Sequence, residues 1–167
     1  MKKLISTAIL TLIVISANAQ NTVTTPSPRI TETGKVKNKT ITIQYGQPSV
    51  KGRSIWGNLV PYGKVWRTGA NETTSIEFSE DVKLEGQQVS KGKYALFTIP
   101  GEDEWTIILN KTIKWGAFSY KQDEDVLRLN VPVKKAAGFH EKLTFSIHPK
   151  GNISLYWENL QVNFKVK

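Results

Sequence analysis

The residues best suited to binding a ligand lie close together in one segment, Gly46 to Asn71, with the sequence GQPSVKGRSIWGNLVPYGKVWRTGAN. Arg53 and Arg67 each lie near a glycine and a tryptophan, so a planar guanidinium group can be presented beside an aromatic face. That pairing suits a carboxylate, a phosphate or a sugar. The segment is also too long for a hairpin turn, and long irregular loops in compact domains often carry function.

A dense run of polar groups ends this segment. The stretch Arg67 to Thr73, RTGANET, carries a cation, an amide, a carboxylate and two hydroxyls immediately before a predicted strand, so these groups can converge on one spot. We therefore expect a polar binding site that accepts an anionic small molecule or a carbohydrate. Its candidate residues are Arg53, Trp66, Arg67, Asn71 and Glu72.

A structural interpretation of the same segment stays open. Each arginine would then bond to loop carbonyls or to a carboxylate such as Glu72, and so fix the loop. Trp56 and Trp66 would close the end of the domain, and Asn71 would be a left-handed turn residue. The two interpretations differ in whether these side chains face a ligand or the protein itself.

A second aromatic cluster, Trp115 to Tyr120 (WGAFSY), precedes an acidic turn. Trp115 and Tyr120 could form a wall on which the apolar face of a sugar stacks. The alternative is core packing, which is the usual place of aromatic side chains in a β-sandwich, and we expect it for at least one of the two.

Catalysis is left undecided by the sequence. The chain has no cysteine and only two histidines, His140 and His148, so we expect no metal site and no cofactor. The common catalytic and phosphate-binding motifs are absent. Two alternatives to a binding protein remain. One is an envelope hydrolase acting on glycans or esters, with Glu72 as acid or base. The other is a structural or partner-binding protein without a small-molecule site.

The N-terminus, residues 1–19, has the pattern of a cleavable secretory signal peptide. Lys2 and Lys3 give a positive start, Leu4 to Ile15 is largely apolar, and Ala17-Asn18-Ala19 is a cleavage signature. The apolar run is shorter than the roughly 18 to 20 residues that span a bilayer. We expect export across the inner membrane to the periplasm or beyond, with no transmembrane segment in the mature chain.

The rest of the chain is predicted to form one domain, residues 30–167, behind a flexible tether of residues 20–29 that is rich in Thr, Ser and Pro. Short alternating or β-branched runs follow one another, separated by turn signals. The clearest are Thr40 to Tyr45, Thr73 to Phe78, Tyr94 to Pro100, Trp105 to Asn110, Val126 to Val133, Leu143 to His148, Ile153 to Trp157 and Gln161 to Val166.

This pattern predicts an all-β fold, an antiparallel β-sandwich of jelly-roll or immunoglobulin-like type with about eight to ten strands. A closed barrel is the alternative. A small hairpin is expected at residues 82–89, and a tight break at Glu158-Asn159. The stretch nearest to a helix is Lys134 to Phe139, where Gly138 limits it to about one turn.

The formal net charge is +9, but the basic residues are spread along the chain. A solvated basic surface is therefore the favoured interpretation, with a weak preference for anionic small molecules. We expect no nucleic-acid partner, and the sequence names no protein partner.

The chain resembles a known family in several runs. They are the stretch from Pro48 to Glu72, which contains VWRTGANE, then GKYALFTIP at 92–100, WTIILN at 105–110 and Trp115-Gly116. These are similar to DUF2911, a secreted bacterial domain of unknown function, from about Pro28 to the C-terminus. The residues that match its motif are Lys51, Gly52, Arg53, Tyr62, Trp66, Arg67, Thr68, Gly69, Asn71 and Glu72. The resemblance implies an exported bacterial protein and carries no activity or catalytic residue with it.

Overall fold

A computed structural model of the protein describes residues 26–167. The predicted signal peptide and the first six residues of the predicted tether lie outside these residues. Within the described part, no helix is long and apolar enough to cross a membrane.

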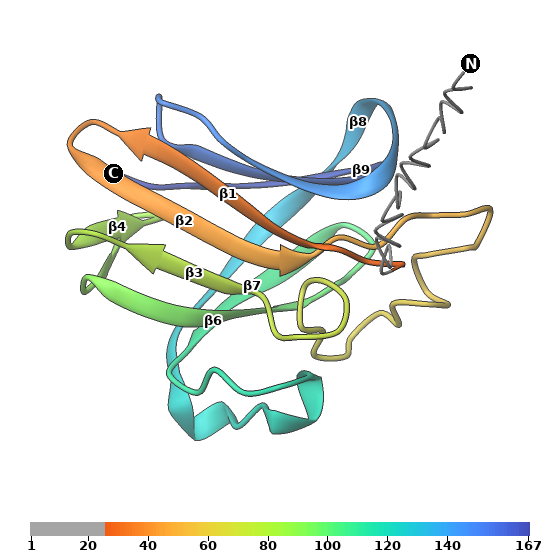
Figure 1. The fold of residues 1–167 in the computed structure, drawn as a ribbon, viewed down its shortest axis with the longest axis horizontal. Coiled ribbons are helices and arrows are strands. Elements are labelled where there is room, and N and C mark those ends of the chain that lie inside the picture. Colours follow the sequence, from red (N-terminus) through yellow and green to blue (C-terminus); the bar gives the residue numbers. More distant parts are fainter. Residues whose placement is uncertain (1–25) are drawn as a thin grey trace, which may run out of the picture.

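The described chain forms nine β-strands and two short 3-10 turns. They are β1 (Arg29–Val36), β2 (Lys39–Gly46), β3 (Ser75–Phe78), β4 (Val82–Leu84), β5 (Gln87–Val89), β6 (Gly92–Ile99), β7 (Glu104–Asn110), η1 (Ala117–Ser119), η2 (Gln122–Glu124), β8 (Asp125–Ile147) and β9 (Asn152–Lys165). Seven strands form one antiparallel sheet in the order β1-β2-β3-β6-β7-β8-β9, and β4 and β5 form the expected separate hairpin (Figure 1). The predicted all-β antiparallel fold is confirmed, and its strands follow one another in the sheet in sequence order.

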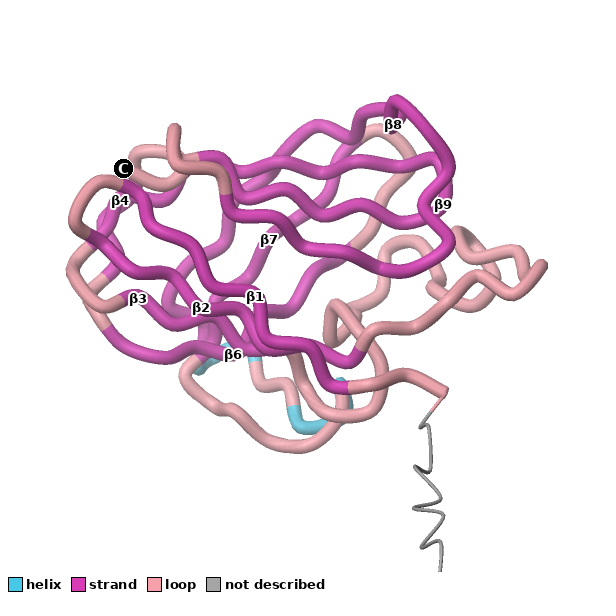
Figure 2. The backbone as a smooth tube through the Cα atoms, turned by 45° about the horizontal axis from the view of Figure 1, so that its top comes forward, coloured by secondary structure: helices cyan, strands magenta, loops and turns pink. Residues whose placement is uncertain are grey.

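The strands form because one row of side chains in each can be buried on the inner face of the sheet. In β2, Ile41, Ile43 and Tyr45 are buried while the residues between them are less so, as the alternation of side chains along a strand requires. The sheet is strongly curled (Figures 1 and 2), so that β1 approaches the far end of β8. There a Cβ atom at Gly34 would overlap the side chain of Ile147. The main core fills the space that the curl encloses, and a smaller cluster of Ala95, Phe97 and Ile108 is packed separately from it.

β8 differs from the expectation at its centre. Lys134 to Phe139, the stretch nearest to a helix by sequence, lies within this strand. Val133 to Lys135 pair with Leu160 to Val162 of β9, so the ladder supplies the backbone hydrogen bonds that a helical turn would otherwise have made. The two runs predicted on either side of this stretch are therefore parts of one 23-residue strand. β1 was not among the predicted runs.

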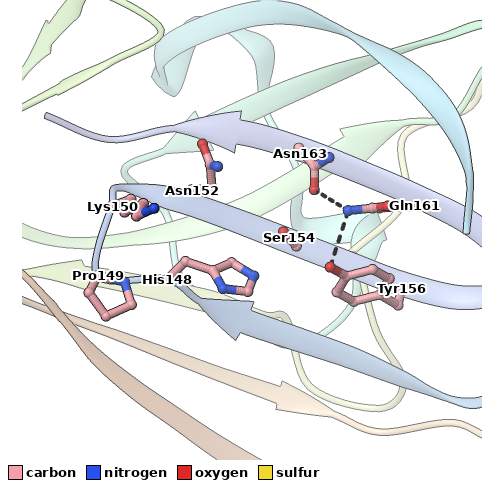
Figure 3. Close-up of a pocket in the computed structure, with 8 residues that line it drawn as sticks. All are labelled: His148, Pro149, Lys150, Asn152, Ser154, Tyr156, Gln161 and Asn163. Carbon is pink, nitrogen blue, oxygen red and sulfur yellow. Dashed lines mark hydrogen bonds between the residues drawn. The ribbon is translucent and has the colours of Figure 1, made fainter. Parts of the chain in front are cut away.

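β9 turns back on itself within its length. Glu158 has a φ of 57° at the predicted tight break. The part of β9 before it pairs with the end of β8, as in Phe145 with Leu155, and the part after it pairs with the middle of β8, as in Val133 with Val162. The two arms of β9 lie side by side (Figure 3).

Two glycine substitutions test this architecture. A Cβ at Gly46, the last residue of β2, would overlap the carbonyl oxygen of Ala70, so we expect Gly46→Ala to lower the free energy of unfolding by about 1–3 kcal/mol. Gly138 has open space around it, so Gly138→Ala should raise that free energy by up to about 1 kcal/mol. Denaturant unfolding of both variants measures the difference. A destabilised Gly138→Ala would contradict the extended course of β8.

Candidate functional site

The segment that carries the candidate residues, residues 47–74, crosses one end of the curled sheet between β2 and β3. Its first part is docked on β8, where Val50 N donates to Glu141 O at 2.7 Å and Leu143 N donates to Pro48 O at 3.0 Å. Its later part is docked on β6, where Trp66 and Thr98 exchange two backbone hydrogen bonds of 2.7 and 2.9 Å. This long loop is thus held by the sheet at two places.

Four tryptophans, here called the tryptophan cluster, attach the loop to the core. Trp56 and Trp66 come from the loop, Trp105 from β7 and Trp157 from β9. The rings of Trp66 and Trp157 are stacked, with centroids 6.0 Å apart and planes at 13°. Trp56 meets Trp105 edge to face at 5.1 Å. The loop therefore closes this end of the domain with its tryptophans, as the structural interpretation expects.

Arg67 has a fixed backbone on both sides. Trp66 before it is bonded to β6, and Arg67 O accepts a hydrogen bond from Thr74 N at 3.2 Å. Thr68 after it is buried at φ 56°, a left-handed conformation that costs a β-branched residue about 1–3 kcal/mol. The Thr68 hydroxyl oxygen lies 3.2 Å from the hydroxyl oxygen of Thr98. The backbone carbonyl of Thr68 accepts a hydrogen bond from Thr74 Oγ1 at 2.9 Å. These bonds hold the strained turn that directs Arg67.

The Arg67 side chain has no bonding partner in the described part of the protein. Its Nε is buried without a hydrogen-bond acceptor, and no ion pair or hydrogen bond of the guanidinium is found among residues 26–167. The side chain lines a pocket of about 250 Å³, here called the Arg67 pocket. Its described lining is Ser27, Pro48, Arg53, Leu59, Val60, Trp66, Arg67, Gly69, Ala70 and Trp157.

Arg53 lies in the same pocket but is bonded to its own loop. Its Nε donates to Val50 O at 3.1 Å and its Nη2 donates to Ser49 O at 2.6 Å. These two bonds match the structural interpretation for this arginine. They also fix the plane of a second guanidinium group beside the pocket, because a forked group bonded at two points has little rotational freedom.

Asn71 and Glu72 lie outside the Arg67 pocket. Asn71 has a φ of 62°, and its side-chain amide donates to Ser27 O at 3.3 Å. Glu72 is paired with Arg29 at 3.5 Å rather than with Arg67, and its side chain is 63% exposed. It borders a separate hollow with Lys114 and Trp115. Of the five predicted site residues, the structure brings together Arg53, Trp66 and Arg67.

Two walls of the Arg67 pocket were missed by sequence reasoning. Trp157 comes from β9, where an aromatic residue in an alternating run indicates only a core position. Ser27 lies in the predicted tether, to which no chemistry was assigned. Its neighbour Pro28 accepts a hydrogen bond from Gln47 N at 2.9 Å, so this part of the chain is held against the loop. Neither residue carries a local signal of its role.

The second aromatic cluster divides into an exposed part and a packed part. Trp115 is 61% exposed and Phe118 is 80% exposed. Tyr120 packs on Phe97 at 5.2 Å and donates to Asp125 Oδ2 at 2.7 Å. Burial raises the pKa of Tyr120, and its hydrogen bond to Asp125 acts in the same direction. Trp115 and Tyr120 thus do not share an aromatic wall.

The histidines lie apart from the Arg67 pocket. His140 is stacked on Tyr156 at 4.8 Å, and His148 lies at the turn between β8 and β9. Among residues 26–167, no group of three or more His, Asp or Glu side chains is placed to hold a metal ion.

The whole of this arrangement lies within one family match. The family model described as "Protein of unknown function (DUF2911)" matches residues 27–166, which is nearly the entire described chain. The protein is a member of the DUF2911 family. This DUF2911 match includes every residue of the Arg67 pocket, from Ser27 to Trp157. Searches of the curated proteins and of the solved structures found no significant match.

The two arginines of the pocket should differ in what they contribute to stability. Arg53→Met removes two hydrogen bonds to loop carbonyls, so we expect the free energy of unfolding to fall by about 1 kcal/mol or more. Arg67→Met removes a buried donor that has no acceptor in the described part of the chain, so stability should be unchanged or higher. Thermal and urea unfolding compare the two variants. A strongly destabilised Arg67→Met would make Arg67 a structural residue instead.

Proposed function

We propose that this DUF2911 protein is an exported binding protein of the bacterial envelope that holds a small anionic molecule, a carboxylate or a phosphate ester, in the Arg67 pocket. The observation that carries the proposal concerns the Arg67 side chain, which lines the pocket. Its Nε is buried, and its guanidinium group has no partner among the described residues. A buried donor without an acceptor is unfavourable, so Arg67 is not held by the protein as a structural staple. The terminal nitrogens of the same guanidinium, which also lack a partner among the described residues, would donate to an anionic ligand in the pocket.

The charge of the pocket supports an anion. Arg53 and Arg67 are the charged residues of its described lining, and no carboxylate is among them. Trp66 and Trp157 form an apolar wall beside the guanidinium groups, and the Coulomb attraction of an anion is stronger where water is partly excluded. The guanidinium fork can bind a carboxylate or phosphate with two parallel hydrogen bonds.

The size and chemistry of the pocket support a small organic anion rather than a sugar. Its volume of about 250 Å³ lies just below the roughly 300–1,000 Å³ of pockets for drug-sized ligands. Ser27 is the only hydroxyl-bearing side chain of the described lining. A sugar needs several uncharged donors and acceptors, whereas one anionic group with a flat apolar body suits two arginines beside a tryptophan face.

A thermal-shift screen tests the proposed ligand class. The purified protein is heated with a panel of small carboxylates, sugar phosphates and aromatic acids. A ligand at about a hundredfold its Kd should add about 2.7 kcal/mol to the free energy of unfolding, which raises Tm by several degrees. We expect that rise to be lost in Arg67→Met.

Two further variants make that result specific. Lys64→Met removes one positive charge from an exposed position of the same loop outside the pocket, and should keep the ligand-induced rise. Glu72→Gln should also keep it, because Glu72 lies outside the pocket. If Lys64→Met and Arg67→Met lose the ligand-induced rise in Tm equally, the rise depends on the net charge of the protein and not on the Arg67 pocket. Absence of any rise across the panel would count against an anion site.

Export is tested separately. The proposal draws on Lys2 and Lys3, the apolar run after them and the Ala17-Asn18-Ala19 signature. N-terminal sequencing of the protein from a bacterial periplasmic extract should begin at Gln20. Recovery of the intact N-terminus from the cytoplasmic fraction alone would contradict export.

A further inference from the structure

The outer face of β9 carries a second hollow. It shares no lining residue with the Arg67 pocket, and its side chains are of a different chemical kind. Ile153, Leu155 and Trp157 of the first arm are buried in the core, so Asn152, Ser154 and Tyr156 point to the opposite face. In the second arm the buried residues are Leu160, Val162 and Phe164, which places Gln161 and Asn163 on that same outer face. Figure 3 shows both polar rows facing one hollow.

This hollow, here called the β9 groove, has a volume of about 420 Å³, within the range of ligand pockets. It is lined by His148, Pro149, Lys150, Asn152, Ser154, Tyr156, Gln161 and Asn163. The described lining contains three carboxamides, two hydroxyls, an imidazole and the ammonium group of Lys150, and no carboxylate. Ser154 is only 2% exposed although it lies on the outer face, so the groove is recessed there.

A hydrogen-bond network fixes the groups at the centre of the groove. Gln161 Nε2 donates to Tyr156 Oη at 3.1 Å and to Asn163 Oδ1 at 2.9 Å (Figure 3). Both hydrogens of the Gln161 amide are thereby used, and its Oε1 is left to accept. Tyr156 accepts from Gln161 and keeps its own hydroxyl hydrogen to donate, and Asn163 keeps its Nδ2 hydrogens. The bonds determine which atoms face a ligand.

The centre of the groove therefore offers fixed, uncharged donors and acceptors next to one another, and Lys150 is the one cationic side chain of the described lining. Each sugar hydroxyl is both a donor and an acceptor, so neighbouring hydroxyls match such a set, whereas an anion would meet acceptors as well as donors. Tyr156 also brings an aromatic ring, held against His140 at 4.8 Å, and Pro149 a saturated one. These apolar surfaces suit the C–H faces of a sugar ring.

The groove continues along the sheet. A neighbouring hollow of about 240 Å³ shares Asn152 and Asn163 with it and extends to Asn130 and Lys134. The one carboxylate in that extension, Glu85, already accepts a hydrogen bond from Lys165 N. A row of carboxamides thus follows the outer face of β8 and β9, which is the shape a chain of sugar units needs rather than a single unit.

We infer that the β9 groove is a glycan-binding site that takes a neutral oligosaccharide chain along the outer face of β9. It is separate from the Arg67 pocket and needs no anionic group on the ligand. The chain would lie across Tyr156 and hydrogen-bond with Gln161 and Asn163, and its far units would reach Asn130.

The test uses defined neutral oligosaccharides with the purified protein. Cello-, xylo-, malto- and chito-oligosaccharides are screened on a glycan array, and each hit is titrated by calorimetry. We expect binding that is unchanged between low and high salt, because no charge pair is involved. The double variant Gln161→Leu/Asn163→Leu should weaken it at least tenfold, with the far-ultraviolet circular dichroism unchanged.

Three controls keep the result specific. Gln88→Leu removes an exposed carboxamide of β5 outside the groove and should bind as the parent does. Arg67→Met should also bind as the parent does, which separates this site from the anion pocket. If the double variant does not fold, side-chain amide signals of Gln161 and Asn163 are followed by NMR in the unaltered protein, and they should shift on titration.

Several outcomes would overturn the inference. One is no binding to any neutral oligosaccharide on the array. Another is binding that persists in the folded double variant, or titration that leaves both amide signals in place. Binding only to acidic polymers, abolished by salt, would assign the groove to polyanions instead.

Discussion

The tryptophan cluster is the interaction on which the site depends. It joins the long loop to β7 and β9, and three of its indole nitrogens, those of Trp56, Trp105 and Trp157, are buried without a hydrogen-bond acceptor among residues 26–167. Their desolvation is unfavourable, so the edge-to-face contacts and the buried area of four large rings must outweigh it. If the loop did not dock, the Arg67 pocket would lose its wall, and Arg67 would lose the strained turn that positions it.

The sequence predicts what depends on local pattern. Alternating runs give most strands, and the glycine- and arginine-rich composition of the loop marks Arg53, Trp66 and Arg67 as candidates. Asn71 and Glu72 are candidates by sequence because they follow Arg67 closely, but the chain turns at Thr68 and neither residue lines the Arg67 pocket. Contacts between distant parts of the chain decide the rest. They bring Trp157 and Ser27 to the pocket and keep β8 extended through a stretch with helix-forming residues.

The two proposed sites use opposite principles of recognition. In the proposed Arg67 pocket, the guanidinium of Arg67 lacks a partner among residues 26–167 and lies against an apolar wall, so the pocket would select a ligand by its charge and planarity. The centre of the β9 groove presents uncharged groups that are already bonded to one another, so this proposed site would select a ligand by the positions of its hydroxyl groups. In a sequence, polar residues that alternate along a strand indicate only a solvent-exposed face. The sequence therefore does not predict the β9 groove. The turn at Glu158 creates it by placing two such faces together.

The placement of the tryptophans also determines the intrinsic fluorescence of the protein. Of the five in the chain, four are gathered in one cluster and Trp115 stands alone at the surface. Emission should therefore separate into a component at shorter wavelength from rings shielded from water and one at longer wavelength from Trp115. A soluble quencher would remove the second first. Because Trp66 and Trp157 border the Arg67 pocket, light from the shielded component reports on what occupies it, without any label attached to the protein.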